Sequence, residues 1–186
     1  MNHRKLGRFD STILKYSNHP PLMNNSSAYE QLIGGQLMTT NRSLSLIADR
    51  LEIIQLTARY AYLVDIKNLD LFMELWGDND PVFDEEAFGL KRITGKNEIR
   101  NFVQSEIFGH MEALCHLTTN HIIEEITDST ATGTCTVLFE GDVRDGGGHL
   151  RATGFYEDQY VRENGMWRFS SRKVIPLTAL QFSASE

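Results

Sequence analysis

The chain has 186 residues, 41% of them hydrophobic and 23% charged, which is enough for one domain with its own core. Lys and Arg number 18 against 25 Asp and Glu, and no basic stripe with interleaved aromatic residues is present, so we expect no nucleic-acid partner. The apolar stretches are much shorter than the roughly 20 residues of a membrane span, and the first thirty residues lack the apolar core of a secretory signal. We therefore expect a cytoplasmic protein that does not contact a membrane.

Residues 1–40 are predicted to form a loose N-terminal arm or extension, and residues 41–186 a single α+β domain. The first segment mixes Asn, Ser, Pro and Gly without a sustained helical or strand period. Two interpretations stay open for it. It is an extension upstream of a natural start at Met38, or an ordered arm that packs on a partner subunit.

A long first helix is predicted to begin at Ser43, a good N-cap residue, and to run to about Val64. Its apolar residues recur every three or four positions and should face the core: Leu44, Ile47, Leu51, Ile54, Ala58 and Tyr62. Asp65 follows at the end where the helix dipole disfavours a carboxylate. An acid in that place calls for an explanation outside the helix.

The next segments alternate between helix and strand. Leu69 to Trp76 is predicted to be a short helix, 82–88 and 90–94 two strands, and 96–109 a third helix. The acidic run Asp84-Glu85-Glu86 is interpreted as a solvated strand edge. Helices therefore dominate the first half of the domain.

Four long strands are predicted in the second half. Short links containing Gly, Asn or Asp join them as hairpins, which indicates one antiparallel meander over residues 114–126, 130–143, 149–162 and 166–177. Helices followed by a strongly curved sheet describe an α+β fold, in which three helices close a cone-shaped barrel with an apolar cavity. Such a cavity is a natural small-molecule pocket.

His116 is the leading candidate for a catalytic base, with Asp65 as its partner. Neutral imidazole is well suited to remove a proton near neutral pH if one ring nitrogen faces the substrate. The other nitrogen must then be a hydrogen-bond donor, and Asp65 accepting that bond would fix the tautomer and stabilise the imidazolium formed during reaction. Taken alone, a histidine on a strand is more often structural than catalytic.

The order of several short motifs resembles the SnoaL-like branch of the nuclear transport factor 2-like superfamily over roughly residues 42–180. The motifs are helix-Asp65, Leu71-Phe72-x-x-Leu75-Trp76, Gly95-x-x-x-Ile99-x-x-Phe102, His116-x-x-Thr119-Asn120, Tyr156-x-Asp158-x-Tyr160 and Trp167-Arg168-Phe169-Ser170-x-Arg172. Within that branch the motif order is most similar to lindane dehydrochlorinase, with bile acid dehydratase and scytalone dehydratase as more distant likenesses. Those enzymes eliminate HCl or water without a cofactor.

The resemblance implies His116 as the base, Asp65 as its brace and Arg172 as a charge-stabilising group. Tyr60 stands where the dehydrochlorinase has a lysine and the bile acid dehydratase a tyrosine, which favours a hydroxyl leaving group over a halide. Tyr60 is also suited to a core position, and Arg172 to an outer sheet face. The expected substrate-binding residues are Asn120, Tyr62 and Trp76.

We expect no metal and no other cofactor. His110, His116 and His121 are close in sequence, but ordinary strand alternation would place His116 and His121 on opposite faces. By analogy with the fold, which often associates through its open sheet face, we expect a homodimer or homotrimer.

Three function classes stay open. The first is a cofactor-free lyase of the dehydratase or dehydrohalogenase type, or an isomerase, acting on an apolar cyclic molecule such as a steroid, polyketide or terpenoid. The second is a non-catalytic binding protein of the same fold, which a cavity with Asp65 and His116 apart would favour. The third is a structural subunit that resembles the small subunit of aromatic-ring dioxygenases, which co-purification with an iron-binding chain would favour.

Overall fold

The computed structural model describes residues 26–183. Contacts divide the chain into two units, Met1–Arg42 and Ser43–Glu186, and each is described by itself. Helix α1, Ser26–Asp65, begins in the first unit and ends in the second. Of the helices in the described part of the chain, none combines the length and the apolar character needed to cross a membrane.

The first helix begins earlier than predicted. Residues 26–40 are helical, so the prediction of a loose arm is wrong for them, and Ser43 lies within α1 rather than at its N-cap. The rest of the predicted arm, residues 1–25, lies outside the described residues. The sequence contains Gly34 and Gly35, each of which costs about 1 kcal/mol in a helix interior, and for this reason no helix was predicted there.

The face that α1 buries is also not the predicted one. Leu44, Ile47, Leu51 and Tyr62 are exposed. The buried side chains lie on the opposite face: Ile53, Leu56, Tyr60, Leu63 and Val64. Both faces carry apolar residues at helical spacing, so periodicity alone could not show which face meets the core.

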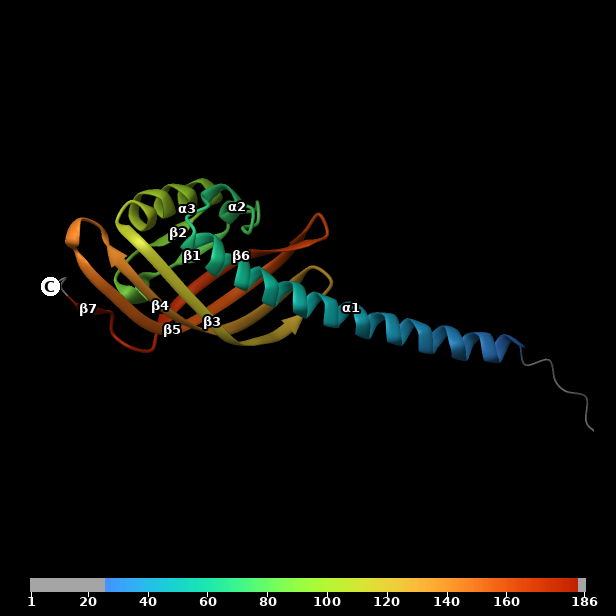
Figure 1. Cartoon of the computed structure of the whole chain (residues 1–186). Coiled ribbons are helices and arrows are strands. Elements are labelled where there is room, and N and C mark those ends of the chain that lie inside the picture. The colour runs from blue at the N-terminus through green and yellow to red at the C-terminus, as the bar shows by residue number, and fades with distance from the viewer. Residues whose placement is uncertain (1–25, 184–186) are drawn as a thin grey trace, which may run out of the picture. The chain divides into compact units, whose positions relative to one another are not determined.

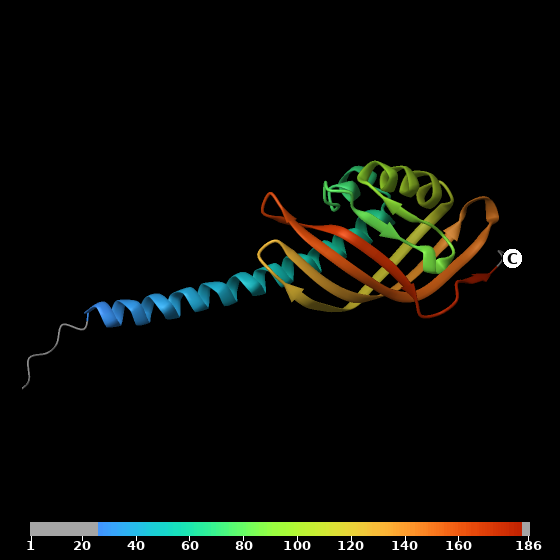
Figure 2. The same ribbon diagram turned by 180° about the vertical axis from the view of Figure 1, so that it is seen from behind.

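The sheet contains seven strands within the described residues (Figures 1 and 2). They are β1 Val82–Asp84, β2 Arg92–Thr94, β3 Met111–Ile126, β4 Thr130–Val143, β5 Gly148–Glu163, β6 Met166–Pro176 and β7 Gln181–Ser183. The hydrogen-bonded order is β2-β1-β6-β5-β4-β3, with β7 paired to β5. All pairs are antiparallel except β1 with β6. The predicted α+β class and antiparallel meander are confirmed, and the sheet is strongly curved without closing into a barrel.

The remaining helical segments are short. They are α2 Leu69–Met73, η1 Glu86–Phe88, α3 Lys96–Phe102, the π-helix η2 Val103–Phe108 that continues α3, and η3 Arg144–Gly146. The first predicted strand is too long because the chain turns into η1, which ends at Gly89 with a φ of 78°. Figure 2 shows α2 and α3 lying across the concave side of the sheet.

An aromatic cluster fills one end of the core between the helices and the concave side of the sheet. Trp76 packs against Phe169 with ring centroids 5.5 Å apart, and Tyr60 against Phe72 with centroids 5.0 Å apart. Such tilted ring pairs contribute about 0.5–1.5 kcal/mol beyond the area that they bury. These rings join α1, α2 and β6 in the core.

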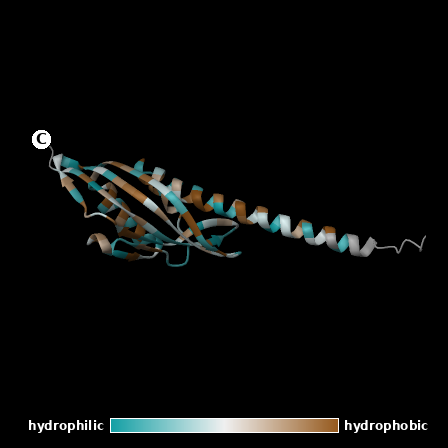
Figure 3. Ribbon diagram, turned by 90° about the horizontal axis from the view of Figure 1, so that it is seen from below, coloured by the Kyte–Doolittle hydropathy of each residue, from teal (hydrophilic) through white to brown (hydrophobic). Residues whose placement is uncertain are grey.

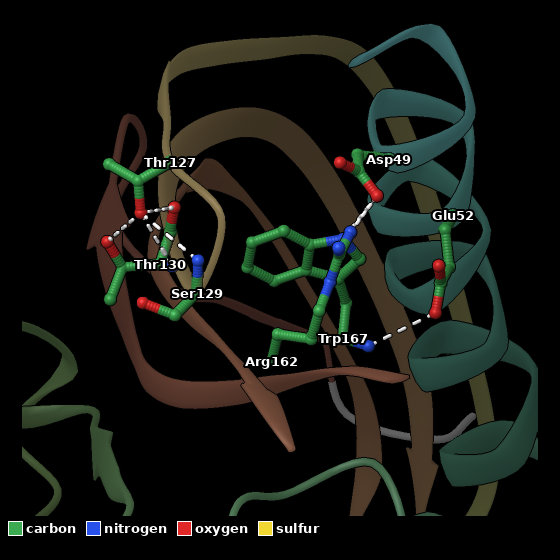
Figure 4. A network of polar contacts seen from close by, with 7 residues as sticks. All are labelled: Asp49, Glu52, Thr127, Ser129, Thr130, Arg162 and Trp167. Atoms are coloured by element: carbon green, nitrogen blue, oxygen red, sulfur yellow. Dashed lines mark hydrogen bonds and ion pairs between the residues drawn. The ribbon is translucent and has the colours of Figure 1, made fainter. Parts of the chain in front are cut away.

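Polar contacts fasten α1 to the hairpin of β5 and β6 (Figure 4). Asp49 accepts a hydrogen bond of 3.3 Å from the Trp167 indole N–H and pairs with Arg162. Glu52 accepts from the Trp167 backbone N–H at 3.1 Å. The Arg162 guanidinium also lies 4.6 Å from the centroid of the Trp167 ring. These contacts fix the helix that carries Tyr60 and Asp65.

Helix α1 and the residues after it also bind the open edge of the sheet. Strand β3 ends the sheet, so one row of its backbone groups has no strand partner. Arg50 donates to the Ile123 carbonyl at 2.8 Å, and Lys67 donates to the Glu112 carbonyl at 2.9 Å. Asp65 accepts from the backbone N–H of His116 on the same edge.

Candidate active site

A cavity of about 350 Å³ lies between α1, η1, η2 and the concave side of β3–β6. This volume is at the lower end of the range for small-molecule pockets. Most of its lining is apolar, and it includes Val64, Leu114, Val137, Phe139, Ala152 and Val174. Among the residues that bring polar groups to this lining are Tyr60, Glu85, His116 and Tyr156.

His116 and Asp65 are in direct contact at this cavity. The Nδ1 atom of His116 lies 2.6 Å from Oδ1 of Asp65, and the backbone N–H of His116 donates to Oδ2 at 2.9 Å. The side chains are 11% and 22% exposed. One carboxylate thus holds both the backbone and the ring of the same residue, which explains the acid at the unfavourable end of α1.

This contact fixes how the ring can act. An ionised carboxylate can only accept hydrogen bonds, so Nδ1 is the donor to Asp65, and in the neutral tautomer with this bond the lone pair lies on Nε2. The ring lines the cavity and packs on Phe139 with centroids 5.0 Å apart. Nε2 is then the nitrogen available to a molecule in the cavity.

Two buried tyrosines form the wall between the cavity and a buried ion pair. Burial raises the pKa of both Tyr60 and Tyr156, so each hydroxyl stays protonated and can donate a hydrogen bond. The Arg172 guanidinium lies 4.1 Å from the ring centroid of Tyr60 and 3.9 Å from that of Tyr156. Arg172 itself binds Asp158 through two hydrogen bonds of 2.7 and 2.8 Å.

Arg172 does not line the cavity, contrary to its predicted contact with developing charge. Its side chain and that of Asp158 are both 0% exposed, and the tyrosine rings stand between it and the cavity. The sequence placed Arg172 on the correct strand, but it could not show that Asp158 binds this side chain within the core. Its guanidinium lies against the Tyr60 and Tyr156 rings, so its positive charge is close to both tyrosine side chains.

Glu85 is a cavity residue that the sequence analysis missed. It follows β1 and lines the cavity rather than lying on a solvated edge, and its neighbour Asp84 is buried and paired with Arg92. Burial, and to a smaller extent the Asp84 charge, raises the pKa of Glu85 from 4.5 to about 7. The acidic run Asp84-Glu85-Glu86 does not show from the sequence which of its side chains faces a cavity.

The three predicted substrate-binding residues lie outside the cavity lining. Tyr62 is exposed on α1, because helix rotation turns Tyr60 inward instead. Trp76 is fully buried in the aromatic cluster. Asn120 is exposed, with a φ of 54° at a β-bulge, and donates to the Thr136 hydroxyl.

The same bulge changes the predicted arrangement of the histidines. Strand β3 shifts register between Thr119 and Ile122, so His116 and His121 both fall on its half-buried face rather than on opposite faces. Within residues 26–183, however, no three His, Cys, Asp or Glu side chains are grouped so that they could hold a metal ion. His110 is exposed at the cavity lining beside Glu106.

The sequence of residues 45–173 matches the SnoaL-like domain. The chain belongs to the SnoaL-like family. The family resemblance drawn from the motif order is therefore confirmed. No curated protein sequence is significantly similar to the chain.

Solved structures share the fold. A protein of Novosphingobium aromaticivorans to which aromatic ring hydroxylase activity is ascribed is 28% identical, with a TM-score of 0.69, over 74% of this chain and 94% of that chain. Another from the same organism, to which scytalone dehydratase activity is ascribed, is 18% identical, with a TM-score of 0.66, over 79% and 93%. The hexachlorocyclohexane dehydrochlorinase LinA type 3 of Novosphingobium barchaimii is 22% identical, with a TM-score of 0.68, over 77% and 96%.

Proposed function

We propose that the protein is a cofactor-free lyase that eliminates water, or a comparable small leaving group, from an apolar cyclic molecule. The observation that carries the proposal is the double hydrogen bond from Asp65 to the ring and backbone of His116 at an apolar cavity. This arrangement presents an unprotonated Nε2 to a bound molecule. Elimination is favoured over binding alone because a simple binding pocket has no need of an oriented base.

In the proposed reaction His116 Nε2 removes a proton from the carbon next to the one that bears the leaving group. The electrons of the broken C–H bond form the new double bond, and the bond to the leaving oxygen breaks. Asp65 stabilises the imidazolium that results, because its Oδ1 atom, 2.6 Å from Nδ1, accepts a hydrogen bond from the Nδ1–H group. General base catalysis of this kind contributes about 10²–10⁴-fold in rate.

Glu85 is the proposed acid of the same site. In its protonated form it can donate a proton to the departing hydroxyl, which then leaves as water. The imidazolium afterwards returns its proton to Glu85 through solvent, so the enzyme regains its starting state. Tyr60 and Tyr156 supply further hydrogen-bond donors on the cavity wall, and the buried Arg172 charge behind them favours negative charge on oxygen there.

The acid supports a hydroxyl leaving group rather than a halide. Hydroxide is a poor leaving group and needs a proton, whereas chloride leaves without one. The apolar lining and the small volume support a ring system with few polar groups as the substrate. The same base could also move a double bond, so an isomerase with this substrate class is the nearest neighbouring activity.

Deuterium exchange tests the base directly. Decalone, an apolar bicyclic ketone without a leaving group, should exchange its α-protons with deuterated water faster with the protein than without it, as seen by NMR. β-Hydroxydecalone should in addition lose water to give a conjugated ketone, seen by absorbance. Hexachlorocyclohexane serves as the halide comparison.

The decisive control is the variant His116→Ala. If wild type and variant exchange decalone protons and dehydrate β-hydroxydecalone at the same rate, the proposed role of His116 is wrong. If only hexachlorocyclohexane reacts and chloride is released, the base is supported and the hydroxyl leaving group is wrong.

A structural subunit is the second candidate, because the chain shares 28% identity with a protein described as an aromatic ring hydroxylase. This candidate predicts that the protein purifies with a larger iron-binding chain and that His116→Ala leaves the activity of that assembly unchanged. The oriented His116 is the observation that speaks against it.

A further inference from the structure

Helix α1 leaves an apolar row without a partner on its outer face. We define the α1 seam as Leu44, Ile47, Leu51, Ile54 and Ala58. Leu44, Ile47 and Leu51 are 59%, 56% and 62% exposed, and Ile54 is half-buried. The buried face of the same helix, with Ile53, Leu56 and Tyr60, already packs on the core, so the seam is a second apolar face. Figure 3 shows apolar residues recurring along α1.

The spacing of the seam is that of a coiled coil. Its residues are separated by three, four, three and four positions, which is a repeat of 3.5 residues rather than the 3.6 of a straight helix. In the sequence the same spacing extends upstream to Leu37 and Ile33, with the polar Thr40 as the one exception. An exposed apolar row with this repeat is the pattern that packs side chains into the matching row of another helix.

The residues beside the seam suit a partner of the same sequence. The positions that flank the core of a coiled coil hold Ser43, Ala48, Arg50, Gln55 and Thr57 within the second unit, and Thr57 is buried against the chain's own core. Arg50 is the single charge among them, and its guanidinium donates to the Ile123 carbonyl. Two copies can therefore approach without opposing rows of like charge, and the Leu and Ile side chains of one seam can pack against those of the other.

From these observations we infer that the α1 seam binds the α1 seam of a second copy of this chain. The interface is separate from the open sheet face, through which proteins of this fold were expected to associate. In parallel coiled coils Leu at the first and Ile at the fourth heptad position favour assemblies larger than a pair, so more than two copies can share the seam.

The mass of the full chain in solution tests this inference. Sedimentation equilibrium of the wild type, whose single chain has a mass of 21.2 kDa, should show at least two chains per particle. The double variant Ile47→Lys, Leu51→Lys should show a lower mass, because two cations on each seam would face each other. Since both residues are exposed, near-ultraviolet circular dichroism should show an unchanged fold.

Leu117→Lys is the matched control. Leu117 is 58% exposed, close to the 62% of Leu51, but it lies on β3. Its variant should keep the wild-type mass. The inference is overturned if the wild type sediments as a single chain, if the seam variant keeps the full mass, or if Leu117→Lys alone dissociates the particle. None of these outcomes depends on the proposed lyase activity.

Discussion

Two of the acid–base pairs in the molecule, His116 with Asp65 and Arg172 with Asp158, differ mainly in burial. The first pair is 11% and 22% exposed and borders the cavity, whereas both members of the second are 0% exposed. Arg172 and Asp158 share two hydrogen bonds, and aromatic rings cover the guanidinium. His116 uses Nδ1 for Asp65, and its ring also lines the cavity.

This difference shows how burial separates structural from chemical roles. A fully buried pair costs desolvation and is stable only while both partners remain, so it acts as a fixed part of the core. A pair at a cavity wall retains access to a substrate and can change its protonation during a reaction. Substitutions at the two pairs and at Glu85 should therefore have different effects on activity and on stability.

The largest effect is expected from removing the cavity base. His116→Ala should lower the rate of elimination or proton exchange about 10²–10⁴-fold with little change in the fold, because the proposed mechanism gives the ring the role of base and the ring lies at the cavity wall rather than in the core. His149→Ala is the control, since His149 lies 2.7 Å from Asp142 in a similar pair that is absent from the cavity lining. Equal rates for the two variants would contradict the assignment.

The buried pair should dominate stability instead. Asp158→Asn leaves the Arg172 charge unpaired in the core and should lower the free energy of unfolding by about 3–5 kcal/mol in urea titrations. Asp142→Asn, which breaks the exposed pair with His149, should have little effect. A small loss for Asp158→Asn would show that the pair is not the fixed core element described above.

Glu85 should make stability depend on pH. Folding raises its pKa from 4.5 to about 7, so its contribution to stability is full below pH 4.5 and is lost as pH rises to about 7. Glu85→Gln should remove this dependence, and at pH 8 it should be more stable than the wild type by at most about 3 kcal/mol. Urea titrations from pH 4 to 8 measure the change, with the exposed Glu86→Gln as the control.

The smallest effect on stability is expected at Asp65, the acid paired with His116. Asp65→Asn keeps an acceptor for the His116 backbone N–H and weakens the ring contact, so the free energy of unfolding should fall by about 1–2 kcal/mol. Activity should nevertheless drop strongly, because the amide no longer stabilises the imidazolium. A loss of stability as large as that of Asp158→Asn would erase the distinction between the two pairs.

The local patterns predicted much of this molecule. The four long strands and their hairpins followed from short polar links, such as Asn164-Gly165, whose two positive φ values suit a tight turn. The contact of His116 with Asp65 was also expected, from motif order and from an acid at the wrong end of a helix.

Features that depend on three-dimensional packing were not predictable in the same way. The sequence could not show which of the two apolar faces of α1 packs on the core, and in the structure Tyr60 is buried while Tyr62 is exposed. The bulge at Asn120 reversed the expected face of His121. Glu85 became a cavity residue only because the chain turns from β1 into η1 beneath the open side of the sheet. None of these leaves a distinct mark in the sequence.

The side-chain hydrogen bonds from α1 and Lys67 to strand β3 also oppose aggregation. An edge strand of 16 residues, with one row of backbone groups free of a strand partner, is a template for intermolecular sheet formation, and Arg50, Asp65 and Lys67 occupy part of that row. The opposite edge, β2, has only three residues and offers little to a passing chain. The segment that holds the His116 ring thus also covers part of the edge to which a neighbouring molecule could add.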